Sequence, residues 1–136
     1  MRRSDQRQAA IVALYQHDLT GKPLEEALGS NASRLSRALV DGVMERSSEF
    51  DQLIERHAHG WSVTRIHPLE RSILRVALLE MLYPTTLPGE KQIPAEGAID
   101  EAIESAKTFC SSDTPAFING VLAAVLREVR ENSLKL

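Results

Sequence analysis

The sequence has 136 residues, with 16 Lys and Arg against 19 Asp and Glu, a net charge of −3 when histidines are neutral. A chain of this length is typical of one domain whose core needs neither disulfides nor a structural metal. Its single cysteine, Cys110, cannot form an internal disulfide, and no apolar run reaches the ~20 residues of a membrane span. These features favour a cytoplasmic protein without a membrane segment. Because the charge balance is acidic, any contact with nucleic acid must depend on local clusters of basic residues.

The N-terminal part of the chain is expected to be helical. Apolar residues at helical spacing predict a first helix that begins at Ser4 or Asp5, both good capping residues, and ends near Asp18. Glycine and proline then break the helix, and a short helical piece follows over residues 24–28. Residues 30–33 offer several caps for the next helix.

A longer apolar stripe between residues 35 and 54 has the period of a helix. Ser47 and Ser48 interrupt this stripe, and serine side chains compete with the helical backbone for hydrogen bonds. We therefore expect two helices rather than one long helix, followed by a boundary at residues 60–62.

The stretch from Pro68 to Tyr83 is the expected centre of the fold. Its apolar residues cover most of the circumference of a helix, a pattern typical of a helix that is buried among others. Pro68 suits the first helical position, and Pro84 cannot continue the helix. The charged side chains left for its outer side are Glu70, Arg71, Arg75 and Glu80.

Two more helices are expected after the central one. Residues 84–94 are rich in proline and glycine, which predicts a loop without structure of its own. Pro94 can open the next helix, and capping residues before Pro115 mark the start of a last helix that runs to about Arg130. Gly120 costs this helix ~1 kcal/mol relative to alanine, which indicates close approach by a neighbouring helix. The predicted fold class is all-α, with about seven helices and no strand.

Few patterns in the sequence are typical of catalysis or metal binding. His57 and His59 would point ~200° away from each other on a helix, and no cluster of cysteines or carboxylates completes a zinc site. There is no glycine-rich phosphate loop, no nucleophile elbow and no pair of catalytic carboxylates. We therefore expect no catalytic residue, no metal and no cofactor.

The N-terminus indicates a binding function. Arg2, Arg3 and Arg7 gather at the start of the chain, and Tyr15 lies two turns beyond Arg7 on the same predicted helix. Basic side chains that neutralise phosphates, and aromatic rings that stack on unpaired bases, are the two means by which proteins bind single-stranded RNA. The same residues also fit a solvated helix end with Tyr15 in the core, so both interpretations stay open on the residues alone.

Four blocks of sequence carry a family resemblance. They are Arg7 with AA at residues 9–10 and ALYQ at 13–16, ERSILRVA at 70–77 with EML at 80–82, IDEAIE at 99–104 with AK at 106–107, and FINGVL at 117–122. In this order and together, they resemble the NusB family of bacterial transcription antitermination factors, over nearly the whole chain.

The resemblance implies a fold and a function. The fold is one NusB-like domain, residues 1–136, of seven helices in two three-helix subdomains, about 1–59 and 60–136. The function is that of an adaptor, not an enzyme. It binds boxA, a short single-stranded RNA element, together with the ribosomal protein NusE, and it joins the antitermination complex of RNA polymerase on ribosomal RNA operons.

The resemblance also implies two sets of site residues. The RNA face consists of Arg2, Arg3, Arg7, Tyr15, Phe117 and Asn119. The face toward NusE consists of Glu70, Arg71, Arg75 and Asp113. From the residues themselves, Phe117 either offers a stacking surface in the first turn of the last helix or packs that helix against the core, and Asn119 either contacts RNA or bonds within the fold.

Three other functions stay in view. A NusB-like domain also forms the N-terminal part of an rRNA cytosine methyltransferase, but we expect no room for its catalytic domain in 136 residues. A small all-helical enzyme would use Arg75 and Glu80 in a pocket between helices. A helical homodimer would bury the face meant for NusE.

Overall fold

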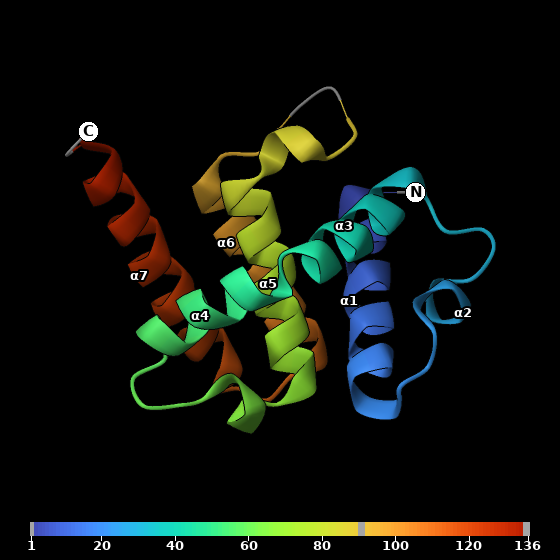
Figure 1. The fold of residues 1–136 in the computed structure, drawn as a ribbon, viewed down its shortest axis with the longest axis horizontal. Helices are drawn as coiled ribbons and strands as arrows, with labels where there is room; N and C mark the ends of the chain where they lie inside the picture. Colours follow the sequence, from blue (N-terminus) through green and yellow to red (C-terminus); the bar gives the residue numbers. More distant parts are fainter. Residues whose placement is uncertain (1, 90–91, 135–136) are drawn as a thin grey trace.

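The computed structural model describes residues 2–89 and 92–134 (Figure 1). Within these residues the chain forms seven α-helices and two short 3₁₀ helices and contains no strand, which confirms the all-α class. The α-helices are α1 (Arg3–Thr20), α2 (Leu24–Leu28), α3 (Arg34–Glu45), α4 (Ser47–His57), α5 (Pro68–Leu82), α6 (Ala95–Phe109) and α7 (Thr114–Leu134). The 3₁₀ helices are η1 (Val63–Arg65) and η2 (Pro84–Thr86).

Local residue chemistry sets the helix ends in the first half of the chain. Gly21 ends α1 in the left-handed conformation, with φ 77°, and its N–H donates to the carbonyl of His17. Ser33 caps α3, because its Oγ accepts a hydrogen bond from the N–H of Ser36 at 3.0 Å. The predicted division near residues 47 and 48 is confirmed, since α3 ends at Glu45 and α4 begins at Ser47.

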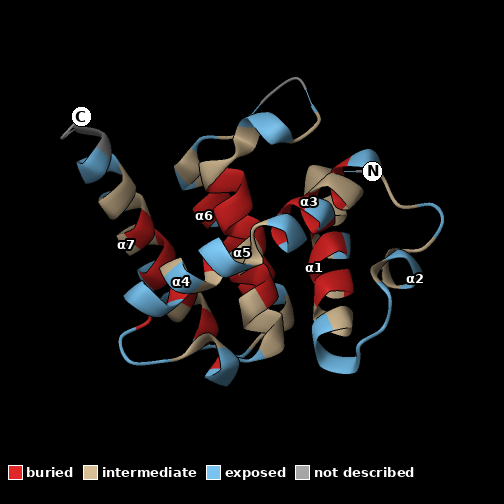
Figure 2. Ribbon diagram, viewed as in Figure 1, coloured by how far each residue is buried: buried red, intermediate tan, exposed pale blue. Residues whose placement is uncertain are grey.

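The central helix α5 packs against helices from both halves of the chain. It contacts α1, α3 and α4 as well as α6 and α7, and most of its length is buried (Figure 2). Pro68 occupies its first turn, and Nδ1 of His67 caps it by accepting from the N–H of Leu69 at 3.2 Å. The predicted central position is therefore confirmed. The predicted division into two subdomains near residue 60 stays a prediction. Helix α5 packs against helices on both sides of that boundary.

The structure corrects five details of the sequence analysis. Glu80 is buried, 2% exposed, and does not lie on the outer side of α5. Residues 84–86 form a 3₁₀ turn instead of an unstructured loop. Pro94 is the N-cap of α6 and not its first residue, and α7 begins one residue before Pro115.

The fifth correction concerns the glycines. A Cβ at Gly120 would meet no atom within 4 Å, so no neighbouring helix approaches this position. The close approach occurs at Gly42 of α3, where a Cβ would lie 2.7 Å from a methyl carbon of Leu79 on α5.

Among the described residues, no helix is long and apolar enough to cross a bilayer.

Candidate nucleic-acid interface

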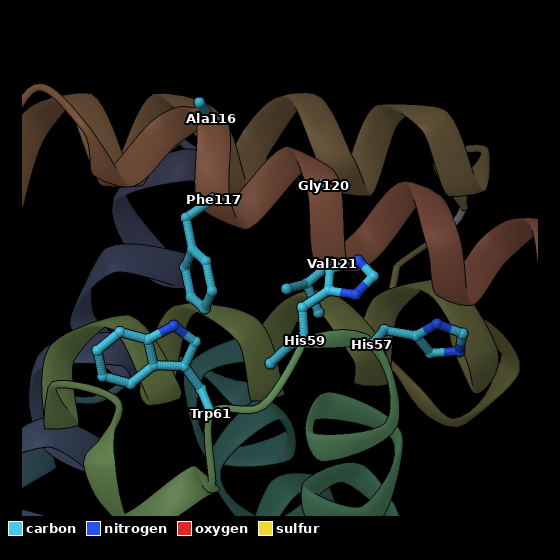
Figure 3. Close-up of a pocket in the computed structure, with 8 residues that line it drawn as sticks. His57, His59, Trp61, Ala116, Phe117, Gly120 and Val121 are labelled. Atoms are coloured by element: carbon cyan, nitrogen blue, oxygen red, sulfur yellow. The ribbon is translucent and has the colours of Figure 1, made fainter.

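An aromatic surface lies where the turn after α4 meets the first turns of α7. Trp61 is 53% exposed, and Phe117 is half-buried against the core. Phe117 points from α7 toward the indole of Trp61 (Figure 3). Between them lies a cleft of about 270 Å³. Its other lining residues are His57, Ala58, His59, Ala116, Gly120 and Val121.

A second cleft, of about 300 Å³, continues from the same two aromatic residues toward the start of α5. It is lined by Trp61, Arg65, Ile66, His67, Glu70 and Phe117. The imidazole of His67 stacks on the ring of Tyr15, with 6.1 Å between the ring centroids and 19° between the planes. Tyr15 of α1 is therefore connected, through the stacked ring of His67, to the cleft that Trp61 and Phe117 line. We call Tyr15, Trp61, His67 and Phe117 the aromatic row.

The backbone after α4 explains why Trp61 is exposed. His59 and Gly60 both have positive φ, 47° and 90°, which turns the chain sharply at the end of the helix. The N–H of Trp61 donates to the carbonyl of Ala58 at 3.3 Å and closes this turn. The indole is thereby held outside the core.

The structure brings together only some of the predicted RNA residues. Tyr15 and Phe117 both belong to the aromatic row, and Asn119 is exposed on α7 two residues beyond Phe117. Arg2 is exposed and pairs with Asp5, with 3.3 Å between Nε and Oδ2. Arg2 and Arg3 lie at the start of α1, about 18 Å along the helix from Tyr15 at ~1.5 Å per residue.

Arg7 occupies a different environment from the one that the sequence indicated. Its side chain is 3% exposed and is therefore not on the surface with Arg2. Its Nε and Nη2 donate to the two carboxylate oxygens of Glu80 at 2.6 and 2.8 Å, and its Nη1 donates to Glu101 at 2.9 Å. Burial by itself would lower the pKa of Arg7, but the hydrogen bonds that Arg7 donates to Glu80 and the negative charges of Glu80 and Glu101 raise this pKa above its ordinary value. Arg7 thus remains charged and joins α1 to α5 and α6.

Two of the residues predicted to face a protein partner are engaged inside the molecule. Arg71 binds Asp18 of α1, with Nη2 and Oδ2 2.9 Å apart, and also donates to the carbonyl of Val63. Arg75 binds both carboxylate oxygens of Asp51 on α4 at 2.8 and 3.0 Å. These pairs fasten α5 to α1 and α4.

The other two predicted partner residues lie where the first turn of α5 meets the start of α7. Glu70 accepts a hydrogen bond from the hydroxyl of Thr114 at 2.8 Å, and Asp113 is exposed just before the helix. The pair of residues expected for a small helical enzyme is not brought together, because Arg75 binds Asp51 while Glu80 binds Arg7.

The histidines beside the cleft have separate environments. His57 and Arg56 both bind the carboxylate of Glu128 on α7, at 2.9 and 2.6 Å. The hydrogen bond from His57 has the larger effect and that from Arg56 the next, and both lower the pKa of Glu128. Within residues 2–89 and 92–134, no three His, Cys, Asp or Glu side chains are grouped so that they would hold a metal.

Trp61 is the residue of this surface that the sequence analysis did not select. Residues 60–62 have the sequence pattern of a boundary between helices and of nothing more. One signal was available: Trp61 is the only tryptophan of the chain, and it lies outside every predicted apolar stripe.

Known proteins match the chain over nearly its full length. Residues 4–127 match the NusB family. The chain is 44% identical to the transcription antitermination protein NusB of Frankia casuarinae, over 65% of this chain and 61% of that protein. It is 35% identical to NusB of Myxococcus xanthus, over 88% of this chain and 90% of that protein.

Solved structures show the same fold. The structure of T. maritima NusB superposes with a TM-score of 0.81 at 33% identity and covers 94% of this chain and 92% of its own. A structure described as antitermination factors NusB and NusE in complex with dsRNA superposes with a TM-score of 0.75 at 24% identity, over 94% of this chain and 99% of its own. The sequence match over residues 4–127, together with the shared arrangement of helices, shows that this chain belongs to the NusB family.

Proposed function

We propose that the protein is an RNA-binding transcription antitermination factor. It binds boxA-type single-stranded RNA together with a NusE-type ribosomal protein and joins the antitermination complex of RNA polymerase on ribosomal RNA operons. It acts in the cytoplasm as an adaptor and catalyses no reaction.

The aromatic row is the observation that supports RNA binding most directly. Tyr15 and Phe117 are 102 positions apart in sequence, yet they lie on one continuous surface because His67 and the second cleft connect them. Stacking of a base on an exposed aromatic ring is worth ~1–3 kcal/mol, and it tolerates sequence variation because every base has a flat face. A row of rings therefore suits several successive unpaired bases.

The start of α1 supplies the charge for the phosphates. Arg2 is exposed, and the side chain of Arg3 is 30% exposed and 3.9 Å from the carboxylate of Glu80. Both residues precede the region that matches the family, residues 4–127. Arg7 contributes indirectly, because its buried ion pairs hold the start of α1 on α5 and α6.

The protein partner is expected beside the start of α7. Asp113 is an exposed carboxylate there. Glu70 lies near it, because Glu70 accepts a hydrogen bond from Thr114, the residue that follows Asp113. Acidic side chains complement a basic ribosomal protein. A chain of the same fold occurs in the structure described as NusB and NusE with dsRNA. Arg71 and Arg75 support this surface from within through Asp18 and Asp51.

The test is an isothermal calorimetry experiment with the cognate NusE-type protein, in the presence and absence of boxA RNA. We expect a heterodimer, and a ternary complex when the RNA is added. Asp113→Lys should weaken the heterodimer by reversing a charge at the interface, whereas Glu26→Lys on α2, also an exposed acidic residue, should not. Failure to form either complex would refute the proposed function, and equal affinities of the two variants would place the partner on another surface.

A further inference from the structure

We infer that the cleft between Trp61 and Phe117 is a nucleotide pocket that holds one unpaired base of the RNA, with Trp61 as its stacking platform. This inference rests on the proposed RNA binding and extends it to a residue outside the predicted RNA face.

The dimensions of the cleft suit a single flat ring system. Its volume is about 270 Å³, just below the ~300–1,000 Å³ of pockets that hold drug-sized ligands. The indole of Trp61 forms one wall, and α7 at Phe117 and Gly120 forms another. Gly120 leaves this wall without a side chain. A Cβ at this position would meet no atom within 4 Å, so there is room for a side chain that the sequence does not place there. The glycine therefore keeps the cleft open and is not required by close helix packing.

The exposure of Trp61 is not explained by the packing of the fold. The indole is 53% exposed and is the largest exposed apolar side chain among the described residues, while the buried core is complete without it. Burying a large aromatic side chain contributes strongly to stability. A tryptophan held half outside the core by a turn of two residues with positive φ is available for a flat ligand instead.

The charges around the two clefts favour a polyanion. The side chains of His59 and Arg65 have no hydrogen-bond or ion-pair partner within the described part of the chain. The nearby carboxylates are engaged: Glu70 accepts from Thr114, and Glu128 accepts from Arg56 and His57. A phosphate that enters beside the base thus meets free cationic or donor groups. A basic protein segment would find the nearest carboxylates, Glu70 and Glu128, already engaged, which is why RNA fits this cleft better than a basic protein partner.

The experiment uses Trp61 as its own reporter, because it is the only tryptophan of the chain. The full-length protein is titrated with a dye-labelled boxA-type RNA of about a dozen nucleotides. The anisotropy of the dye reports RNA binding, and the emission of Trp61 reports stacking. We expect the two signals to change together with one affinity. Inorganic polyphosphate, a polyanion without bases, should leave the emission of Trp61 unchanged.

Two variants test the pocket independently. Trp61→Ala should weaken RNA binding by about 5- to 150-fold, the loss expected for one stacked base, whereas Trp61→Phe should retain much of the affinity. Gly120→Leu fills the cleft but keeps the reporter, so it should weaken binding and remove the change in emission. Thermal melting by circular dichroism identifies any variant that fails to fold.

Each outcome decides the question. RNA binding with unchanged emission of Trp61 would overturn the pocket and leave the proposed function standing. A change in emission caused by the NusE-type protein and not by RNA would assign the cleft to the protein partner and would also overturn it. Absence of RNA binding in the wild-type protein, with or without the NusE-type protein, would refute the proposed function itself.

Discussion

Arg7 and Glu80, 73 positions apart in sequence, form a two-point ion pair in the interior of the protein, with N–O distances of 2.6 and 2.8 Å. The side chains are 3% and 2% exposed. A buried pair of this kind contributes little net stability relative to apolar residues of the same size, because both charges lose their hydration. Removing one partner is costly, however, because the other charge is left buried.

The first prediction concerns this pair. Arg7→Met should lower the free energy of unfolding by ~3–5 kcal/mol, since Glu80 then keeps only the distant Arg3 as a partner. The double variant Arg7→Met with Glu80→Leu should be more stable than Arg7→Met alone. Urea denaturation of the wild-type protein, the two single variants and the double variant measures both effects. A double variant that loses the sum of the two single losses would show that the ion pair carries no coupling energy.

The second prediction compares two glycines within helices. Gly42→Ala should lower the free energy of unfolding by ~1–3 kcal/mol, because its Cβ would lie 2.7 Å from a methyl carbon of the fully buried Leu79. Gly120→Ala should instead raise it by up to ~1 kcal/mol, because alanine favours the helix and meets no neighbour. Thermal denaturation gives the sign of each change. Equal effects at the two positions would contradict the described packing of α3 on α5.

The third prediction separates the N-terminal arginines by function. Arg2→Ala with Arg3→Ala should weaken RNA binding and reduce the slope of log affinity against log salt by up to about 1.4, the value for two phosphate contacts with single-stranded RNA. Arg127→Ala, at another exposed arginine on α7, serves as the control and should leave the slope unchanged. Anisotropy titrations at several salt concentrations measure the slopes. If the control variant lowers the slope as much as the double variant, the start of α1 has no special role in binding phosphates.

The fourth prediction is a dependence of stability on pH. The pKa of Glu128 is lowered in the folded protein by hydrogen bonds from His57 and Arg56, so folding favours its ionised form. This contribution is complete above the ordinary glutamate pKa of about 4.3 and is lost as the pH falls through the lower pKa of the folded state. The stability difference between the wild-type protein and Glu128→Gln should therefore be largest near neutral pH and decrease below about pH 4. Urea midpoints across this range measure it, and a difference that grows on acidification would show that the sign is wrong.

Local chemistry predicted the order of the helices and several of their ends, although α1 begins at Arg3 without the predicted side-chain cap from Ser4 or Asp5. Ser47 divides two of them, Pro68 begins α5, and Gly21 ends α1 in a conformation that other residues rarely adopt. Each of these effects acts within a few residues, and the sequence displays them directly.

Contacts between distant residues could not be predicted in this way. Glu80 is charged, so it was assigned to solvent, and only the position of Arg7 on another helix makes its burial possible. Gly120 and Gly42 are both glycines in helices, yet only Gly42 faces a neighbour. Periodicity describes one helix at a time and contains no information about the helix opposite.

The candidate site was predicted in part for the same reason. Tyr15 and Phe117 were selected through the family resemblance, and the structure places both in the aromatic row. Trp61 was missed because it belongs to a turn, where no periodic pattern distinguishes a buried side chain from an exposed one.

The central position of α5 has a consequence for how the protein meets its ligand. Two helices pack directly on α5: α1, which carries Tyr15, and α7, which carries Phe117. The ring of Tyr15 also stacks on His67, the residue that caps α5. The spacing of the rings is thus set when the chain folds, before any RNA arrives. The entropy lost on association then falls on the nucleic acid, which must order its bases to a fixed template, and the protein itself gives up little freedom.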